Sequence, residues 1–214
     1  MPADQETIDW SGGRVSAVWQ RPAHGRTYII LAHGAGGNLH TPGLADLAEI
    51  LCQRVIGVVR FNFPYAEVGR KIPDPQPVLE DCYRAISERV GTEASRLFLG
   101  GRSMGGRIAS HIVAKGTVAD GLVFLSYPLH PPGQPQRLRT RHLPKIAVPM
   151  LFIQGSRDAF ARPDLLESTL AGLSGATLHV IEGADHGLKV KGRTAEEVTN
   201  EIADIVATWI ERQS

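Results

Sequence analysis

The sequence predicts an α/β fold of three layers, in which helices cover both faces of a mostly parallel sheet. One basis is a series of short, continuous apolar runs, which are typical of strands buried on both faces. Another is that these runs alternate along the chain with segments of helical periodicity, as they do in parallel sheets flanked by helices. We find no internal repeat and no dividing linker, so residues 1–214 are predicted to form a single domain.

The individual elements follow from these patterns. Strands are expected at residues 15–20, 27–31, 55–61, 97–100, 121–126, 150–154 and 177–181. Helices are expected at residues 44–54, 77–90, 104–115, 165–173 and 195–212. The last helix has the clearest signal, because its apolar side chains recur with a period of about 3.6 residues. They are Val198, Ile202, Ile205, Val206, Trp209 and Ile210.

Composition and charge exclude several classes of protein. The formal net charge is +1, so no basic field points to a nucleic-acid partner. The first ten residues, MPADQETIDW, carry acids and no apolar core, unlike a signal peptide, and no apolar run is long enough to span a membrane. Cys52 and Cys82 fall in helical patterns and form neither a disulfide framework nor a CxxC metal pair. We therefore expect a cytoplasmic protein.

The segments that follow the strands are the places to look for a binding site, because ligands of open parallel sheets bind beyond the carboxyl ends of the strands. These segments are HGAGGN at 33–38, NFPY at 62–65, GGRSMGG at 100–106, GSRD at 155–158 and EGADHG at 182–187. They bring a serine, an acid and a histidine to one edge of the sheet, in that chain order.

The segment GRSMG at residues 101–105 fits the pattern G-x-S-x-G between a strand and a helix. In this pattern, the nucleophile elbow, the serine occupies a sparsely populated backbone conformation on a sharp turn. The residues two before and two after it must be small, because strand and helix nearly collide there. We expect Ser103 Oγ to project from the sheet edge and the Met104 N–H to point at a developing oxyanion. The alternative is a glycine-rich turn with an incidental serine.

Together these motifs resemble the α/β-hydrolase superfamily over nearly the whole chain. Within it, the chain is similar to the small, lid-poor branch related to dienelactone hydrolase, and there to bacterial relatives of testis-expressed protein 30 and KAT8 regulatory complex subunit 3. The narrower resemblance rests on LAHGAGGN, RFNFPY, PDPQP, GGRSMGGR, QGSRDAF and GADHGL. It implies an α/β-hydrolase fold without a large cap domain. Dienelactone hydrolases carry a cysteine nucleophile, whereas Ser103 occupies that place here.

The catalytic roles follow from what a serine hydroxyl needs. It requires a base that accepts its proton during attack, and His186 lies in the loop after the final strand, where this fold supplies that base. The base needs an acid that fixes its tautomer, and Asp158 follows the strand at 150–154. Asp185 is a competitor, but adjacent loop residues seldom direct their side chains at each other in line. His33 is expected to hold its own loop by hydrogen bonds.

The HGAGG turn supplies the second oxyanion donor, as the similar HGGG turn does in esterases. We favour the Ala35 N–H, with that of Gly36 as the alternative. Phe63 and Tyr65 either wall an acyl pocket or serve packing. The turn is not a dinucleotide fingerprint, because G-x-G-x-x-G needs glycine at Leu39. The sequence also lacks a Walker A or H-E-x-x-H motif, so we expect neither a cofactor nor a metal.

The segment 128–149 lies where larger hydrolases insert a lid. It holds six prolines and is too short for a helical cap, so we expect an open site for small substrates. Its basic residues, Arg137, Arg139, Arg141 and Lys145, either favour anionic substrates or form a solvated loop. Arg102 and Arg107, which flank the elbow, are expected to pair with acids rather than to touch substrate.

Two functions fit these observations. The first is a serine hydrolase, a carboxylesterase or thioesterase, that cleaves a small acyl substrate through an acyl-enzyme. The second is a non-catalytic protein-binding module with the same fold. The intact set of Ser103, His186 and Asp158 favours the first. Neither the natural substrate nor any protein partner follows from the sequence.

Overall fold

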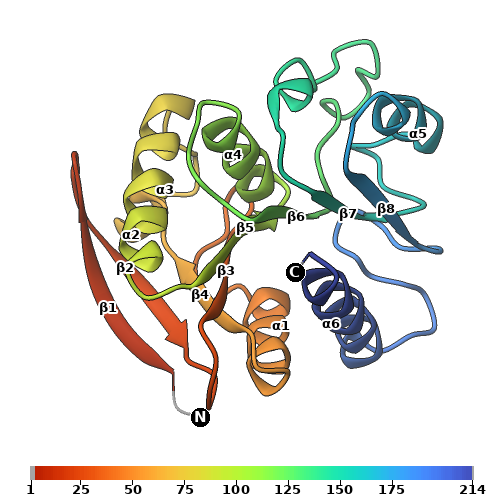
Figure 1. Ribbon diagram of the computed structural model, residues 1–214. Coiled ribbons are helices and arrows are strands. Elements are labelled where there is room, and N and C mark those ends of the chain that lie inside the picture. The colour runs from red at the N-terminus through yellow and green to blue at the C-terminus, as the bar shows by residue number, and fades with distance from the viewer. Residues whose placement is uncertain (1–2, 214) are drawn as a thin grey trace.

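A mixed sheet organises the computed structural model, which describes residues 3–213 (Figure 1). Its strands are β1 (Asp4–Trp10), β2 (Gly13–Gln20), β3 (Thr27–Ala32), β4 (Gly57–Phe61), β5 (Arg96–Arg102), β6 (Gly121–Leu125), β7 (Met150–Gly155) and β8 (Ala176–Ile181). The helices are α1 (Pro42–Gln53), α2 (Pro64–Glu67), α3 (Gln76–Gly91), α4 (Met104–Val113), α5 (Pro163–Ala171) and α6 (Ala195–Glu211), with a 3₁₀ turn at Leu143–Lys145. The elements are thus those of an α/β fold.

The strand order in the sheet is β1-β2-β4-β3-β5-β6-β7-β8. β1 pairs antiparallel with β2, and β2 antiparallel with β4, whereas all pairs from β4 to β8 are parallel. The chain leaves β3 for β4 on one side and later returns to β5 on the other. The direction of winding therefore reverses between β3 and β5, which is where open parallel sheets bind ligands.

Helices cover both faces of the sheet, as the sequence predicts. α3, α4 and α5 pack on one face, and α1 and α6 lie side by side on the other (Figure 1). Each face has its own core, in which apolar side chains of the helices meet those of alternate strand positions. Within residues 3–213, no helix has the length and apolar character required to cross a membrane.

The hairpin at the N-terminal end is the main element that the sequence analysis missed. The sequence predicts a strand at residues 15–20, within β2, but none at β1. The residues of β1 pair with β2 from Asp4–Trp19 to Trp10–Gly13. β1 lies at the edge of the sheet, and only Ile8 of its side chains is buried. An exposed edge strand needs no apolar run, and polar residues there discourage pairing with other chains. The expected strand at 55–61 also starts later, because Val55 has a left-handed φ of 65° and β4 begins at Gly57.

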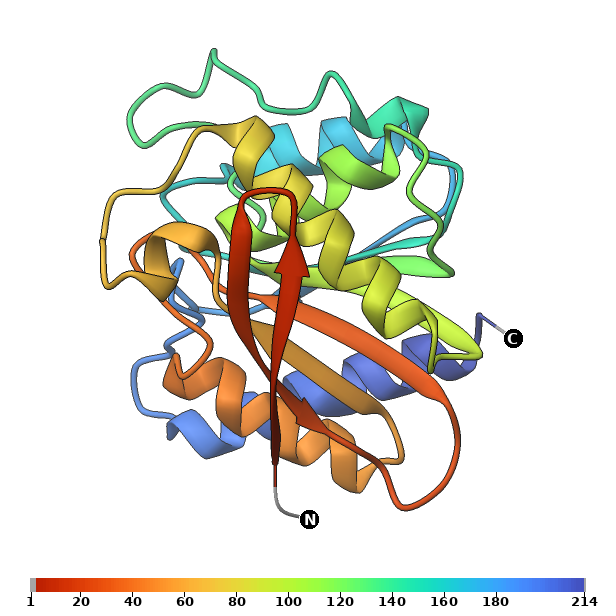
Figure 2. The ribbon, with the colours of Figure 1, turned by 90° about the vertical axis from the view of Figure 1, so that its left-hand side faces the viewer.

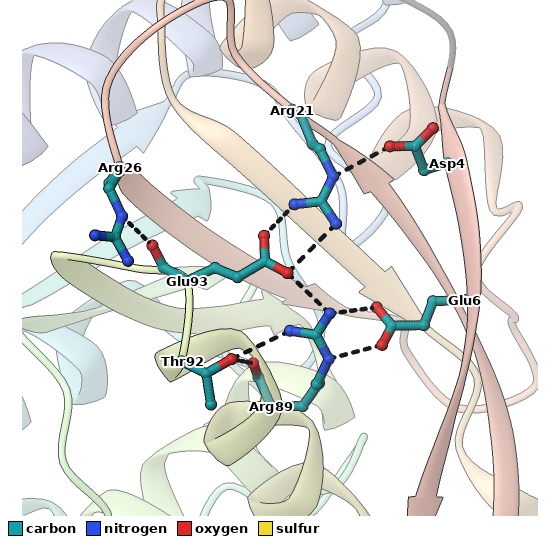
Figure 3. Close-up of polar contacts among 7 residues, drawn as sticks. All are labelled: Asp4, Glu6, Arg21, Arg26, Arg89, Thr92 and Glu93. Carbon is teal, nitrogen blue, oxygen red and sulfur yellow. Dashed lines mark hydrogen bonds and ion pairs between the residues drawn. The ribbon is translucent and has the colours of Figure 1, made fainter.

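This hairpin lies against α3 (Figure 2), and charged side chains fasten the two together (Figure 3). Arg21, which follows β2, and Arg89 of α3 both bond to Glu93. Arg89 also donates two hydrogen bonds to Glu6 of β1, of 2.7 and 3.1 Å. The guanidinium carbons of Arg21 and Arg89 lie 4.4 and 4.9 Å from the ring centre of Trp19, which adds cation–π attraction to the ion pairs.

The loop between β6 and β7 is held down on α4 rather than standing over the sheet edge as a lid. Tyr127 donates a hydrogen bond of 2.9 Å to the Arg139 carbonyl, and Ser110 of α4 lies 2.7 Å from His142 Nε2. Leu129 and Leu143 are fully buried in the core on the α4 side. Of the three leucines in segment 128–149, which are Leu129, Leu138 and Leu143, two are therefore used in packing and cannot cover the sheet edge.

Candidate active site

The turn from β5 into α4 places Ser103 in a strained backbone conformation. Its φ and ψ are 50° and −113°, a region that residues with a side chain rarely adopt. The Ser103 N–H donates to the Leu125 carbonyl at 2.9 Å, and the Arg107 N–H donates to the Ser103 carbonyl at 3.1 Å. The strained turn is thus held by hydrogen bonds on both sides, to β6 and to the first turn of α4. This is the geometry that the G-x-S-x-G pattern predicts.

The glycines of the pattern are required by close backbone contacts. A Cβ at Gly101 would lie 2.3 Å from the Ala32 carbonyl oxygen, and one at Gly105 would lie 2.4 Å from the same atom. Real Cβ atoms do not approach an oxygen so closely, so a side chain at either position would push β3 away from α4. Strand and helix therefore meet at β3 only because both positions lack a Cβ.

Ser103, His186 and Asp158 form one continuous chain of hydrogen bonds. Ser103 Oγ lies 2.8 Å from His186 Nε2, and His186 Nδ1 lies 2.7 Å from Asp158 Oδ2. A carboxylate only accepts hydrogen bonds, so Nδ1 carries the proton and the lone pair of Nε2 faces the serine hydroxyl. The three residues come from the ends of β5, β7 and β8, as the sequence predicts.

Asp185, the competing acid, is used elsewhere. Its Oδ1 accepts hydrogen bonds from the backbone N–H groups of Gly187 and Lys189, at 2.7 and 3.0 Å. It therefore shapes the loop that carries His186 without reaching the imidazole.

Two residues that support this arrangement were not singled out from the sequence. Gln154 at the end of β7 donates from Nε2 to Asp158 Oδ2, and the Phe160 N–H donates to Asp158 Oδ1 at 2.7 Å. The Phe160 ring stacks on the His186 imidazole with 4.2 Å between ring centres. Asp158 has a fully buried side chain, so these donors replace the water it loses. Gln154 and Phe160 both lie inside the QGSRDAF motif, within four residues of Asp158, and that proximity was the available signal.

The HGAGG turn after β3 lies directly against the nucleophile. A Cβ at Gly34 would be 3.6 Å from Ser103 Cβ, and the turn closes through a 3.1 Å hydrogen bond from the Gly37 N–H to the Gly34 carbonyl. Ala35 and Gly36 form the tip of this turn, and Gly36 has a left-handed φ of 73°. The Met104 N–H belongs to the first turn of α4, where no intrahelical acceptor exists for it. The turn that carries Ala35 and Gly36 and the first turn of α4, which carries Met104, thus adjoin Ser103.

His33 holds this turn in place, as expected from the sequence. Its Nε2 accepts the Phe63 N–H at 3.2 Å, which leaves Nδ1 to donate to the Gly34 carbonyl at 2.8 Å. Burial lowers the pKa of His33 to about 4, so the ring is neutral at pH 7. It links the segment after β3 to the segment after β4.

Phe63 and Tyr65 serve packing, which is one of the two roles that the sequence leaves open for them. Both side chains are fully buried. Phe63 packs edge-on against His33 and Phe61, and the Tyr65 hydroxyl donates to the Gly34 carbonyl at 3.3 Å. These aromatic side chains face the core beneath the turn because they must cover the apolar end of the sheet there.

The two arginines beside the elbow differ from each other, and neither forms the expected ion pair. Arg107 donates to Gln76 Oε1 at 3.0 Å and lies 3.3 Å from His111 Nε2. Within residues 3–213, Arg102 forms no ion pair or hydrogen bond through its guanidinium, although the charges of Asp185 and Asp158 lie close enough to affect it. Its side chain points to the face of the sheet covered by α1 and α6.

Metal ligands do not gather around this site. In the part of the chain that the structure describes, no three His, Cys, Asp or Glu side chains come together as they would around an ion.

Fold and sequence together define the class of protein. Residues 25–211 match the family described as "Alpha/beta hydrolase domain", and the chain belongs to this family.

Solved structures agree with this class. An alpha-beta serine hydrolase homologue from Coxiella burnetii superposes with a TM-score of 0.78 at 18% identity, over 98% of this chain and 98% of that one. A dienelactone hydrolase from Anabaena variabilis gives 0.78 at 17% identity, over 99% and 97%. An α/β serine hydrolase without a lid from Xanthomonas campestris gives 0.76 at 21% identity, over 98% and 96%. At such identities the likeness is one of fold.

Proposed function

We propose that this protein is a serine hydrolase that cleaves esters or thioesters of small acyl groups through an acyl-enzyme. The observation that carries the proposal is the hydrogen-bonded chain from Ser103 Oγ through His186 to Asp158. The hydrolase fold supports the general class, and the side chains at the sheet edge support the chemistry.

In the first half of the reaction, Ser103 Oγ attacks the acyl carbon while its proton moves to His186 Nε2. Asp158 stabilises the imidazolium that forms, because its carboxylate accepts a hydrogen bond from the Nδ1–H group and stays ionised. Collapse of the tetrahedral intermediate expels the alcohol or thiol, which takes the proton back from Nε2. The acyl group stays on Ser103 as an ester.

In the second half, water replaces the serine hydroxyl as the attacking group. His186 accepts the water proton and returns it to Ser103 Oγ, and the carboxylic acid leaves. In both halves, negative charge develops on the acyl oxygen, and we assign the backbone N–H groups of Met104 and Ala35 to bind it. The Gly36 N–H is the alternative second donor.

A fluorophosphonate probe tests the nucleophile directly. The wild-type protein should be labelled, Ser103→Ala should not be, and Ser126→Ala should be labelled like the wild type. Ser126 is the matched control because it also has a left-handed φ, of 56°, at the end of a strand, but it is fully buried. If the wild-type protein is neither labelled nor active on a panel of acyl esters and thioesters, the alternative of a non-catalytic binding module replaces the proposal.

The substrate class is proposed from the loop between β6 and β7. A helical lid could shelter a long acyl chain and gain about 25 cal/mol per Å² of buried apolar surface. Here Leu129 and Leu143 are buried in the core, and Leu138 is the one leucine of this loop that is exposed, at 40%. Methylenes beyond the pocket would stay in water, so acetyl and butyryl aryl esters should be better substrates than esters with chains of about ten carbons.

Measuring kcat/KM across an acyl series tests this size limit. We expect a plateau or a decline after short chains, whereas a steady rise to long chains would show that the loop acts as a lid. The panel also decides between ester and thioester substrates. The closer kinship to testis-expressed protein 30 and KAT8 regulatory complex subunit 3, and the cytoplasmic location, stay predictions of the sequence.

A further inference from the structure

A cavity of about 470 Å³ is lined by the first turns of α1 and α6 and by the segment that follows His186. The two helices lie side by side in Figure 1. Its volume falls within the range of about 300–1,000 Å³ that is common for small-molecule sites. Gly187 and Leu188, which directly follow the catalytic histidine, form part of its wall. Ser103 and His186 are not among its lining residues but their chain neighbours Arg102 and Gly187 are, so the cavity adjoins the site of hydrolysis without including its reacting atoms.

The inner surface of this cavity is apolar. Its walls come from the core between the helices and the sheet, and these side chains are at most 5% exposed. They are Leu44, Leu47, Leu125, Val198 and Ile202. An alkyl or aryl group would therefore lose water on entering, which is favourable.

Arg102 contributes the cavity's most buried charge. It is half-buried, and within residues 3–213 its guanidinium has no hydrogen-bond or ion-pair partner. Burial lowers the pKa of Arg102, while the charges of Asp185 and Asp158 oppose that shift. A guanidinium stays charged in proteins, so it has given up water at this position without gaining a direct partner.

The charged side chains that line the cavity are mostly positive. Lys189 and Arg193 stand at the mouth, although Arg193 is already paired with Glu201 at 2.6 Å, and Asp46 is the acid among the lining residues. The first turn of α1 contains no acidic residue and receives no side-chain cap, so its N-terminal dipole adds to the positive potential. The cavity thus combines a cationic wall with an apolar interior.

We propose that this cavity binds a small monocarboxylate with an apolar tail, whose carboxylate pairs with the Arg102 guanidinium. A guanidinium binds a carboxylate with two parallel hydrogen bonds, which suits one planar anionic group better than a point charge does. The tail then packs against Leu47, Val198 and Ile202. The proposal does not depend on hydrolase activity, because binding is measured directly.

Calorimetry with octanoate, and with octanamide as its neutral counterpart, tests the site. We expect octanoate to bind the wild-type protein at least about tenfold more tightly than octanamide. Arg102→Met should weaken octanoate binding by about ten- to a hundredfold, the range expected for loss of a charged hydrogen-bonded contact. Arg102→Lys should lose less than Arg102→Met. Ile202→Trp, which fills the cavity from the α6 wall, should abolish binding, and Arg84→Met on the exposed face of α3 should change nothing.

The two substitutions change different walls of the cavity, so the test still works if one variant fails to fold. Should Arg102→Met be unstable in thermal unfolding, Ile202→Trp still reports on the cavity. Absence of octanoate binding to the wild type overturns the proposal. So does binding that persists unchanged in Arg102→Met and Ile202→Trp, which would place octanoate elsewhere, and so does equal affinity for octanamide.

Discussion

Two sets of polar contacts can be compared: the ion-pair network around Trp19 and the hydrogen-bonded chain of Ser103, His186 and Asp158. They differ in how exposed their side chains are and in how many partners link them. Around Trp19, the side chains of Arg21, Glu93 and Arg89 are about one third exposed, and Glu93 bonds to both arginines (Figure 3). At the sheet edge, Asp158 is fully buried and His186 has 24% of its side chain exposed. His186 is the one residue that joins Asp158 to Ser103.

The difference shows that charged residue types alone do not reveal a role. In the Trp19 network, water and a second partner replace any contact that is lost, and hydrogen bonds from Arg21 and Arg89 hold the pKa of Glu93 below its usual value despite partial burial. In the buried chain, Gln154 and Phe160 also hold the Asp158 carboxylate, but His186 alone links it to Ser103. We therefore expect variants of the buried chain to lose function and variants of the network to lose a little stability.

The largest expected effect is that of removing the nucleophile or its base. Ser103→Ala and His186→Ala should each lower kcat by about 10⁶-fold, because the two residues act as a unit. The double variant should lose little more than either single one. Circular dichroism should show an unchanged fold. Additive losses in the double variant would contradict the proposed mechanism.

The next effect is that of the buried acid. Asp158→Ala should lower kcat by about 10⁴-fold, less than loss of His186, because the imidazole can still accept a proton when it is poorly oriented. Asp185→Asn is the matched control, since its oxygen still accepts the Gly187 and Lys189 N–H groups. Steady-state kinetics on one ester compares the two. Equal losses would mean that the histidine loop, and not the acid, dominates the effect.

Acid should destabilise the fold through histidines that are buried in neutral form. Burial lowers the pKa of His33 and His111 to about 4 and that of His142 to about 3. Unfolded histidine titrates near 6.5, so below this pH the unfolded chain binds more protons than the native one. The free energy of unfolding should then fall as the pH drops from about 6.5 towards 4, by up to about 1.4 kcal/mol per pH unit for each histidine.

Urea unfolding at several pH values measures this slope. His142→Gln should flatten it by about one proton, and His40→Gln on the surface should leave it unchanged. If His142→Gln keeps the full slope, burial does not keep His142 neutral in the native state.

The smallest expected effect is that of the exposed network. Glu93→Gln should lower the free energy of unfolding by about 1 kcal/mol, with a smaller loss at high salt, and should leave kcat unchanged. Glu88→Gln, an exposed position on α3, which ends just before Glu93, is the control and should have no effect. Denaturant titrations at low and high salt provide the measurement. A loss of several kcal/mol would show that this network is as irreplaceable as the buried chain.

Much of the site could be predicted from local pattern, because its residues follow strands that the pattern identifies. Ser103 and Asp158 follow buried apolar strands, and His186 follows the partly exposed edge strand β8. Parallel strands deliver such positions to one edge. The sequence predicts small residues around Ser103 because the flanking strand and helix come close, and in the structure the atom that Gly101 and Gly105 both approach is the Ala32 carbonyl oxygen of β3. β1 escaped prediction because an edge strand with one buried side chain has no apolar signal.

Other features depend on packing between distant segments. Phe63 and Tyr65 follow a strand like the catalytic residues, yet they turn into the core, since the end of the sheet beneath the oxyanion turn must be covered by apolar groups. Gln154 and Phe160 support Asp158 through contacts that no spacing rule distinguishes from ordinary ones. The local sequence predicts where a strand and a turn lie, but it does not predict which side chains will pack into a given space.

Arg102 and Arg107 show most plainly which features the sequence determines and which depend on tertiary packing. Both are arginines beside one serine, so their composition and spacing predict the same role for each. Strand alternation sends Arg102 to the α1 and α6 face, into a cavity, while Arg107 on α4 meets Gln76 and His111. Periodicity along the chain specified the elements and the catalytic edge, because it reflects burial of each element's own face. The surroundings of each arginine were decided by helices far away in sequence, because packing between elements depends on all of them at once.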